Sequence, residues 1–149
     1  MINWWEPGTQ KNYLEKANCF IDQYENYTFD IDGETIHLNG VNTLGENIAD
    51  NGGLKQALRA YDQLVARHGP EPLLPGLEYT QRQLFWISSA SALCRVWRPS
   101  ALKKYILTDP HSPSAPRVNI PLSNLPEFAT DWSCPAGSPM NPVNKCSVW

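Results

Sequence analysis

A chain of 149 residues corresponds to one domain or to part of a larger one, and its hydrophobic fraction of 42% is enough for a packed core. Only 18% of the residues are charged, which is low for a free-standing soluble domain and suggests that part of the surface covers another structure. The formal net charge of -3 and the lack of a basic run argue against nucleic acid as a ligand, and no apolar run reaches the roughly 20 residues of a membrane helix.

The first half of the chain predicts two helices separated by a β-hairpin. Apolar residues recur at helical spacing over residues 9–27, and residues 29–38 alternate around an Asp32-Gly33 turn. A second helix is predicted over residues 43–68, with Thr43 as its N-cap and Glu46 completing a capping box. The Gly52-Gly53 pair in its middle indicates a kink or close backbone packing.

Twelve of the 13 prolines lie after residue 69, and this part of the chain predicts shorter elements. Residues 80–97 read as a helix, apolar enough to be buried on most sides. A short helix is expected over 99–107, a proline-punctuated loop over 109–121, another short helix over 124–130 and an irregular tail over 134–149.

Two carboxylates on the second helix are the first candidates for chemistry. Glu46 and Asp50 are four residues apart, so their side chains share one face of the helix. Lys55 is the nearest basic residue on that helix and is not at ion-pair spacing, so a bound metal cation would offset the cost of burying both charges. The alternative is that Glu46 only caps the helix and that Asp50 is solvated.

Four segments in order along the chain resemble the neprilysin and endothelin-converting enzyme family of zinc endopeptidases. The segment NTLGENIADNGG at 42–53 is similar to the family's Glu-x-x-x-Asp segment, and NCFIDQY at 18–24 to the segment before it. LTDPHSPS at 107–114 resembles the family's C-terminal active-site loop, while PMNP at 139–142 and CSVW at 146–149 resemble its terminal signature. Residues 1–149 are therefore identified as the C-terminal portion of a thermolysin-like (gluzincin) catalytic domain, mainly α-helical with one short hairpin and a long irregular tail.

The resemblance implies a role for each matching residue. Glu46 corresponds to a zinc ligand, Asp50 to the carboxylate that orients a zinc-binding histidine, and His111 to the residue that stabilises the oxyanion. Arg117 corresponds to an arginine that binds the peptide backbone. Ala92 and Leu93 stand where relatives often have Val-Trp, lining the pocket for the residue after the cleaved bond, which implies a roomier pocket here.

The family's His-Glu-x-x-His helix has no counterpart in this sequence, because none of the three histidines is followed by glutamate. The resemblance implies that this helix lies shortly before Trp4-Trp5, so the chain alone is expected to lack two zinc ligands and the general base, and to be inactive. Its expected partners are peptide substrates with hydrophobic residues and the missing N-terminal part of the same enzyme. The alternative is a natural, truncated, non-catalytic protein that binds peptides as a decoy.

The cysteines and one sequon point to an oxidising compartment. Cys19, Cys94, Cys134 and Cys146 form no Cys-x-x-Cys pair, and Asn26-Tyr27-Thr28 is a glycosylation sequon. The resemblance implies a Cys19–Cys146 disulfide, with Cys94 and Cys134 left for partners in the N-terminal region. It also implies a parent that is secreted or held at the cell surface by a single membrane span.

Overall fold

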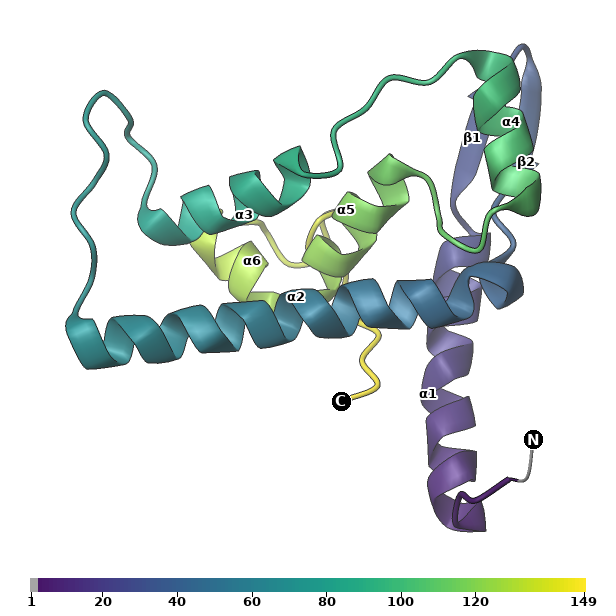
Figure 1. Ribbon diagram of the computed structural model, residues 1–149, viewed down its shortest axis with the longest axis horizontal. Helices are drawn as coiled ribbons and strands as arrows, with labels where there is room; N and C mark the ends of the chain where they lie inside the picture. Colours follow the sequence, from purple (N-terminus) through teal and green to yellow (C-terminus); the bar gives the residue numbers. More distant parts are fainter. Residues whose placement is uncertain (1–2) are drawn as a thin grey trace. The chain divides into compact units, whose positions relative to one another are not determined.

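The computed structural model describes residues 3–149 as six helices and one two-stranded antiparallel sheet (Figure 1). The elements are α1 (Pro7–Glu25), β1 (Thr28–Ile31), β2 (Glu34–His37), α2 (Gly40–His68), α3 (Gln81–Ser91), α4 (Pro99–Thr108), α5 (Ser114–Asn124) and α6 (Pro126–Asp131). The prediction of a mainly helical chain with one hairpin is confirmed. Among the described residues, no helix combines the length and the apolar character needed to cross a membrane.

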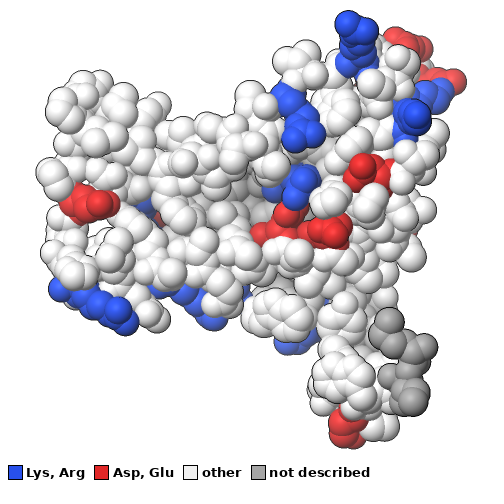
Figure 2. Space-filling view, in the orientation of Figure 1, with Lys and Arg blue, Asp and Glu red and all other residues white. Residues whose placement is uncertain are grey.

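The chain divides into two compact units, and the boundary falls inside α2 between Ala49 and Asp50. The first unit consists of residues 1–49, 97–113 and 146–149, and the second of residues 50–96 and 114–145. Figure 2 shows one face on which wide areas carry no charged side chain, in keeping with the charged fraction of 18%.

In the first unit, α1 contributes three residues to the core because its apolar residues fall on one face. Ala17, Phe20 and Tyr24 are buried there, at helical spacing. The hairpin pairs Thr28 with His37 and turns at Asp32 and Gly33, which both have positive φ. Helix α4 lies beside the hairpin, and Lys103 of α4 forms an ion pair with Glu34 of β2 (Figure 1).

In the second unit, α3, α5 and α6 pack around the later part of α2. The core is a cluster of Leu58, Trp86, Leu122 and Leu125. Asp131 of α6 links two positions of α3, because it accepts hydrogen bonds from Arg82 at 3.0 Å and from the Trp86 indole at 2.7 Å.

Helix α2 differs from the prediction at its start. It begins at Gly40 instead of Thr43, and Asn39 is the residue whose side chain accepts from a first-turn amide, that of Asn42 at 2.9 Å. Thr43 is not a cap, because its hydroxyl donates to the Asn39 carbonyl. The helix also continues unbroken through Gly52-Gly53, and a Cβ at Gly53 would meet nothing within 4 Å, so Gly53 is not a point of close packing.

Two further predictions are corrected in the second half of the chain. Residues 114–121, expected to be part of a loop, belong to α5 (Ser114–Asn124), and Pro116 is tolerated there because it occupies the first helical turn, where a missing N–H costs no helical hydrogen bond. Helix α3 ends at Ser91, well before residue 97, and of its residues only Trp86 is buried. The prediction that this helix is buried on most sides is therefore wrong for this structure.

Replacing two glycines of α2, Gly40 and Gly45, by alanine should change the free energy of unfolding in opposite directions. A Cβ at Gly40 would overlap the backbone carbonyl oxygen of Ile21 in α1, whereas a Cβ at Gly45 would meet nothing within 4 Å. We expect Gly40→Ala to lower the free energy of unfolding by about 1–3 kcal/mol through overpacking. Gly45→Ala should raise it by about 0.5–1 kcal/mol, because alanine loses less backbone entropy in a helix.

Urea denaturation of the three oxidised chains checks both signs. A Gly40→Ala chain as stable as the parent would contradict the close approach of α1 and α2 at this point.

Candidate functional site

The two candidate carboxylates lie on adjacent turns of α2 and are both accessible. The side chain of Glu46 is 44% exposed and that of Asp50 is 22% exposed. Each carboxylate has a partner that can donate a hydrogen bond to it, whereas the sequence of α2 alone suggested that both are unpaired. Their partners come from segments more than 60 positions away, so no local spacing in the sequence could have revealed them.

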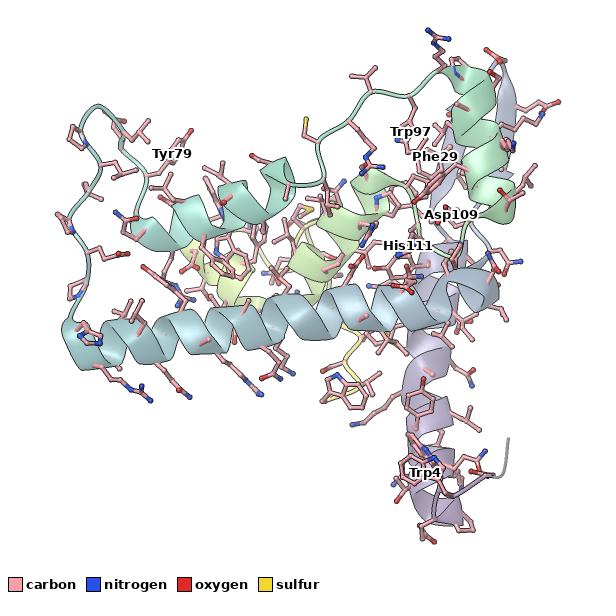
Figure 3. The ribbon with its side chains drawn as sticks, in the orientation of Figure 1. Trp4, Phe29, Tyr79, Trp97, Asp109 and His111 are labelled. Carbon is pink, nitrogen blue, oxygen red and sulfur yellow. A yellow bond between two sulfur atoms is a disulfide. The ribbon has the colours of Figure 1, made fainter. Side chains whose placement is uncertain are left out.

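His111 meets Glu46 in the first unit. The imidazole Nε2 lies 3.2 Å from Glu46 Oε2, and Nδ1 lies 3.0 Å from Asp109 Oδ1 (Figure 3 labels Asp109 and His111). Both acceptors are carboxylates, so the ring is held between two groups that accept hydrogen bonds. Sequence reasoning placed His111 in the site but gave it no contact with Glu46.

Asp109 is a functional candidate that sequence reasoning missed. Its Oδ1 accepts from the backbone N–H of His111 at 2.8 Å as well as facing the imidazole. The hydrogen bond from the His111 backbone amide lowers the pKa of the Asp109 carboxyl, burial opposes this shift, and the His111 ring and Tyr105 lower the pKa further. The carboxylate is therefore ionised at neutral pH and orients the ring. An Asp two residues before a His in a proline-rich segment was the only available signal.

Arg117 meets Asp50 in the second unit. Its Nε donates to Asp50 Oδ2 at 2.7 Å and one terminal nitrogen donates to Oδ1 at 2.9 Å. Both side chains are about equally shielded, with exposed fractions of 21% and 22%. Two parallel charge-assisted bonds of this kind fix the plane of the guanidinium and use two of its five N–H donors.

A cavity of about 220 Å³ opens beside this ion pair. Asp50 and Arg117 contribute to its wall, and most of the remaining lining is apolar, including Leu54, Leu93 and Val118. Leu93 thus shares a cavity with Arg117. Ala92 lines a separate hollow beside Tyr61 and Phe85, so its assignment to the substrate pocket stays a prediction.

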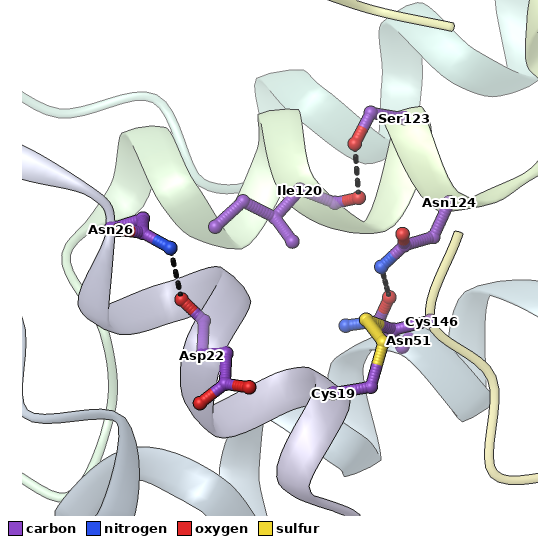
Figure 4. The surroundings of a disulfide bond; sticks show 8 residues. All are labelled: Cys19, Asp22, Asn26, Asn51, Ile120, Ser123, Asn124 and Cys146. Carbon is purple, nitrogen blue, oxygen red and sulfur yellow. Dashed lines mark hydrogen bonds between the residues drawn. A yellow bond between two sulfur atoms is a disulfide. The ribbon is translucent and has the colours of Figure 1, made fainter. Parts of the chain in front are cut away.

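A disulfide lies in the first unit, where Cys19 of α1 is bonded to Cys146 of the tail, with the two Cα atoms 5.7 Å apart (Figure 4). Cys94 and Cys134 are free thiols, the first exposed and the second half-buried. Asn26 is exposed at the C-cap of α1, where its amide donates to the Asp22 carbonyl at 2.9 Å (Figure 4). Its glycosylation stays a prediction.

A metal ion needs more donors than this chain brings together. Over residues 3–149, no group of three or more His, Cys, Asp or Glu side chains is arranged to hold one. The exposed carboxylate of Glu46 is of a type that zinc accepts, and it fits as one ligand of a site completed by other residues.

The family model described as Peptidase family M13 matches residues 1–148, and the chain belongs to this peptidase family. It is 54% identical over 147 residues to Neprilysin-2 of Drosophila melanogaster, covering 99% of this chain and 19% of that protein. It is 44% identical over 149 residues to Neprilysin of Homo sapiens, covering 100% of this chain and 20% of that protein. The chain therefore spans about a fifth of the length of these curated relatives.

Solved structures agree with this assignment. The zinc metalloprotease Zmp1 of Mycobacterium tuberculosis, in complex with an inhibitor, superposes with a TM-score of 0.88 at 28% identity, covering 100% of this chain and 23% of that chain. A Haemonchus galactose-containing glycoprotein complex gives a TM-score of 0.87 at 38% identity, covering 95% and 24%. The resemblance to the neprilysin family and the thermolysin-like fold class are confirmed.

Proposed function

We propose that this chain is the part of a zinc metalloendopeptidase that supplies one zinc ligand, Glu46, and the residues that bind the peptide and stabilise the reacting oxygen. The observation that carries the proposal is the pairing of each carboxylate of α2 with one distant residue, Glu46 with His111 and Asp50 with Arg117. Two independent pairings at successive turns of one helix are hard to reconcile with a helix cap and a solvated aspartate.

Glu46 would hold zinc together with the two histidines of a His-Glu-x-x-His helix, which the printed sequence does not contain. When bound, zinc supplies a Lewis acid that polarises the scissile carbonyl and lowers the pKa of water. Asp50 would support one of these histidines from behind, since carboxylates beside zinc-binding imidazoles fix their tautomer.

His111 and Arg117 would act on the peptide itself. The His111 imidazole, oriented by Asp109, donates a hydrogen bond to the carbonyl oxygen as negative charge develops on it. Arg117 would bind a peptide carbonyl, and its ion pair with Asp50 keeps its guanidinium plane fixed. The apolar lining of the adjoining cavity suits a hydrophobic side chain of the substrate.

The disulfide and the exposed sequon support a protein that folds in the secretory route and works outside the cell or at its surface. Peptides and the remainder of the same enzyme are the partners that this function requires.

Substitution of the two α2 carboxylates tests the proposal in the full-length enzyme that it requires. Glu46→Gln should sharply reduce zinc content after dialysis against a limiting-zinc buffer, because a neutral amide is a poor replacement for a carboxylate ligand. Asp50→Asn should lower metal affinity or activity by about 10–100-fold with the ligand count unchanged.

Glu15→Gln is the matched control, because Glu15 is an exposed carboxylate of α1 that pairs with a surface lysine, Lys11. Full zinc content and activity in the Glu46→Gln enzyme would refute the proposal. The 149-residue chain on its own should show no chelator-sensitive hydrolysis of a fluorogenic peptide, because its sequence contains no His-Glu-x-x-His segment to supply the other two zinc ligands.

A further inference from the structure

A row of buried polar side chains lies beneath the segment that carries His111. Asn47 and Ser112 are each 1% exposed and Thr43 is 2% exposed, although none of the three is apolar. Side chains this deeply buried are found in proteins when their polar atoms have hydrogen-bond partners. All three belong to the first unit.

These side chains form one directed chain of hydrogen bonds. The Ser112 hydroxyl donates to Asn47 Oδ1 at 2.8 Å, Asn47 Nδ2 donates to the Thr43 hydroxyl at 2.8 Å, and that hydroxyl donates to the Asn39 carbonyl at 3.0 Å. All three bonds run in the same direction, and the Thr43 hydroxyl both accepts one bond and donates the next, an arrangement in which neighbouring bonds strengthen one another. Its end point, Asn39, is the cap of α2.

The same segment is attached to α2 at a second point. Asn42 Nδ2 donates to the backbone carbonyl of Asp109 at 3.0 Å. His111 therefore lies between two residues, Asp109 and Ser112, that are each tied to α2 by an asparagine. Asn42 is exposed, so water can replace its bond, whereas no water reaches the buried bond between Asn47 and Ser112.

We propose that Asn47 is a positioning residue for His111, acting through Ser112 to hold the imidazole against Glu46. Asn47 directly follows Glu46, so one turn of α2 presents the carboxylate to the outside and the anchoring amide to the interior. Helix geometry then sets the distance between the Glu46 carboxylate and the Asn47 amide. Through its bond to Ser112, this amide sets the position of the His111 imidazole. The catalytic meaning of this arrangement rests on the proposed function, but the positioning itself does not.

The first test is structural and needs no metal. In the 149-residue chain with labelled histidine, the three ring signals of His37, His68 and His111 are compared by NMR. A nuclear Overhauser contact between the His111 ring and the Glu46 side chain is expected in the parent, given the 3.2 Å separation of Nε2 and Oε2. Asn47→Ala should abolish this contact while leaving the His37 and His68 signals in place.

Ser112→Ala is a second variant, in case the Asn47→Ala chain does not fold. It removes a single hydroxyl and with it the bond to Asn47, so it should also abolish the contact between His111 and Glu46. Ser123→Ala is the matched control: it removes a buried serine hydroxyl that donates to the Ile120 carbonyl at 2.9 Å in the second unit. It should leave the His111 contact intact. A His111–Glu46 contact that survives in the folded Ser112→Ala chain would overturn the proposal.

The second test is a double-mutant cycle in the full-length enzyme. Asn47→Ala should lower kcat by about 10–100-fold with little change in KM, as expected for a residue that orients another. In a His111→Ala background the same substitution should have almost no further effect, because the ring that it positions is gone. Equal effects in both backgrounds would mean that Asn47 contributes only to stability.

The two tests separate the two claims. A His111→Ala enzyme with normal turnover would refute the catalytic role of His111, while the NMR comparison would still decide whether Asn47 positions the ring.

Discussion

Replacing His111 by alanine in the full-length peptidase should lower kcat by about 100–1,000-fold with little change in KM. The reason is that a donor aimed at the carbonyl oxygen binds more strongly once that oxygen carries negative charge, so its loss affects the transition state more than the bound substrate. The contact of His111 Nδ1 with Asp109 at 3.0 Å orients the ring and directs Nε2 towards the side of Glu46, the proposed zinc ligand.

Arg117→Ala should behave differently and raise KM as well. Arginine binds a ground-state carbonyl, so its removal weakens peptide and inhibitor binding before any charge develops. Its removal also strips Asp50 of a bidentate partner, which adds a loss of stability that the histidine variant should not show.

Steady-state kinetics and thermal unfolding, measured side by side, distinguish these roles from a structural one. His68→Ala is a suitable control, because His68 is an exposed residue at the C-terminal end of α2. If both site variants lost activity only in proportion to a lower melting temperature, the two residues would serve merely to hold their segments in place.

Removing the Cys19–Cys146 bridge should cost the chain about 4–5 kcal/mol of unfolding free energy, because the bridge closes a loop spanning a sequence separation of 127. In the chain-entropy model this stabilisation comes from restricting the unfolded state, and it grows slowly with loop length. The bridge also fastens the tail to α1, where Lys16 Nζ donates to the Val148 carbonyl at 2.7 Å.

Denaturant unfolding of a Cys19→Ser/Cys146→Ser chain against the parent measures this loss. The matched control is Cys94→Ser/Cys134→Ser, which changes two thiols that form no bridge in the structure and should shift the midpoint little. Non-reducing peptide mapping should find Cys19 joined to Cys146, with the other two cysteines open to alkylation. A dominant Cys94–Cys134 bridge would contradict the pairing.

Elements whose signals are local could be predicted from the sequence. The apolar spacing of α1, the Asp32-Gly33 turn of the hairpin and the long span of α2 depend on residues a few positions apart, and all three are present in the structure. The shared face of Glu46 and Asp50 is local in the same sense, because helical periodicity alone places residues four apart on one side. The family resemblance likewise rested on short segments read in order.

The tertiary structure decided everything that depends on distant partners. Prolines suggested a loop over residues 109–121, yet part of this stretch is helix α5, because packing against α3 and α6 favours a helix that Pro116 tolerates in its first turn. The start of α2 was set by Asn39 and by the close approach of Gly40 to Ile21. The bond from Arg117 to Asp50 spans 67 positions, and Ser112 reaches Asn47 across 65. Such pairs form only when the chain brings their segments together, so residue spacing along α2 predicted the carboxylates but not the side chains that complete the site.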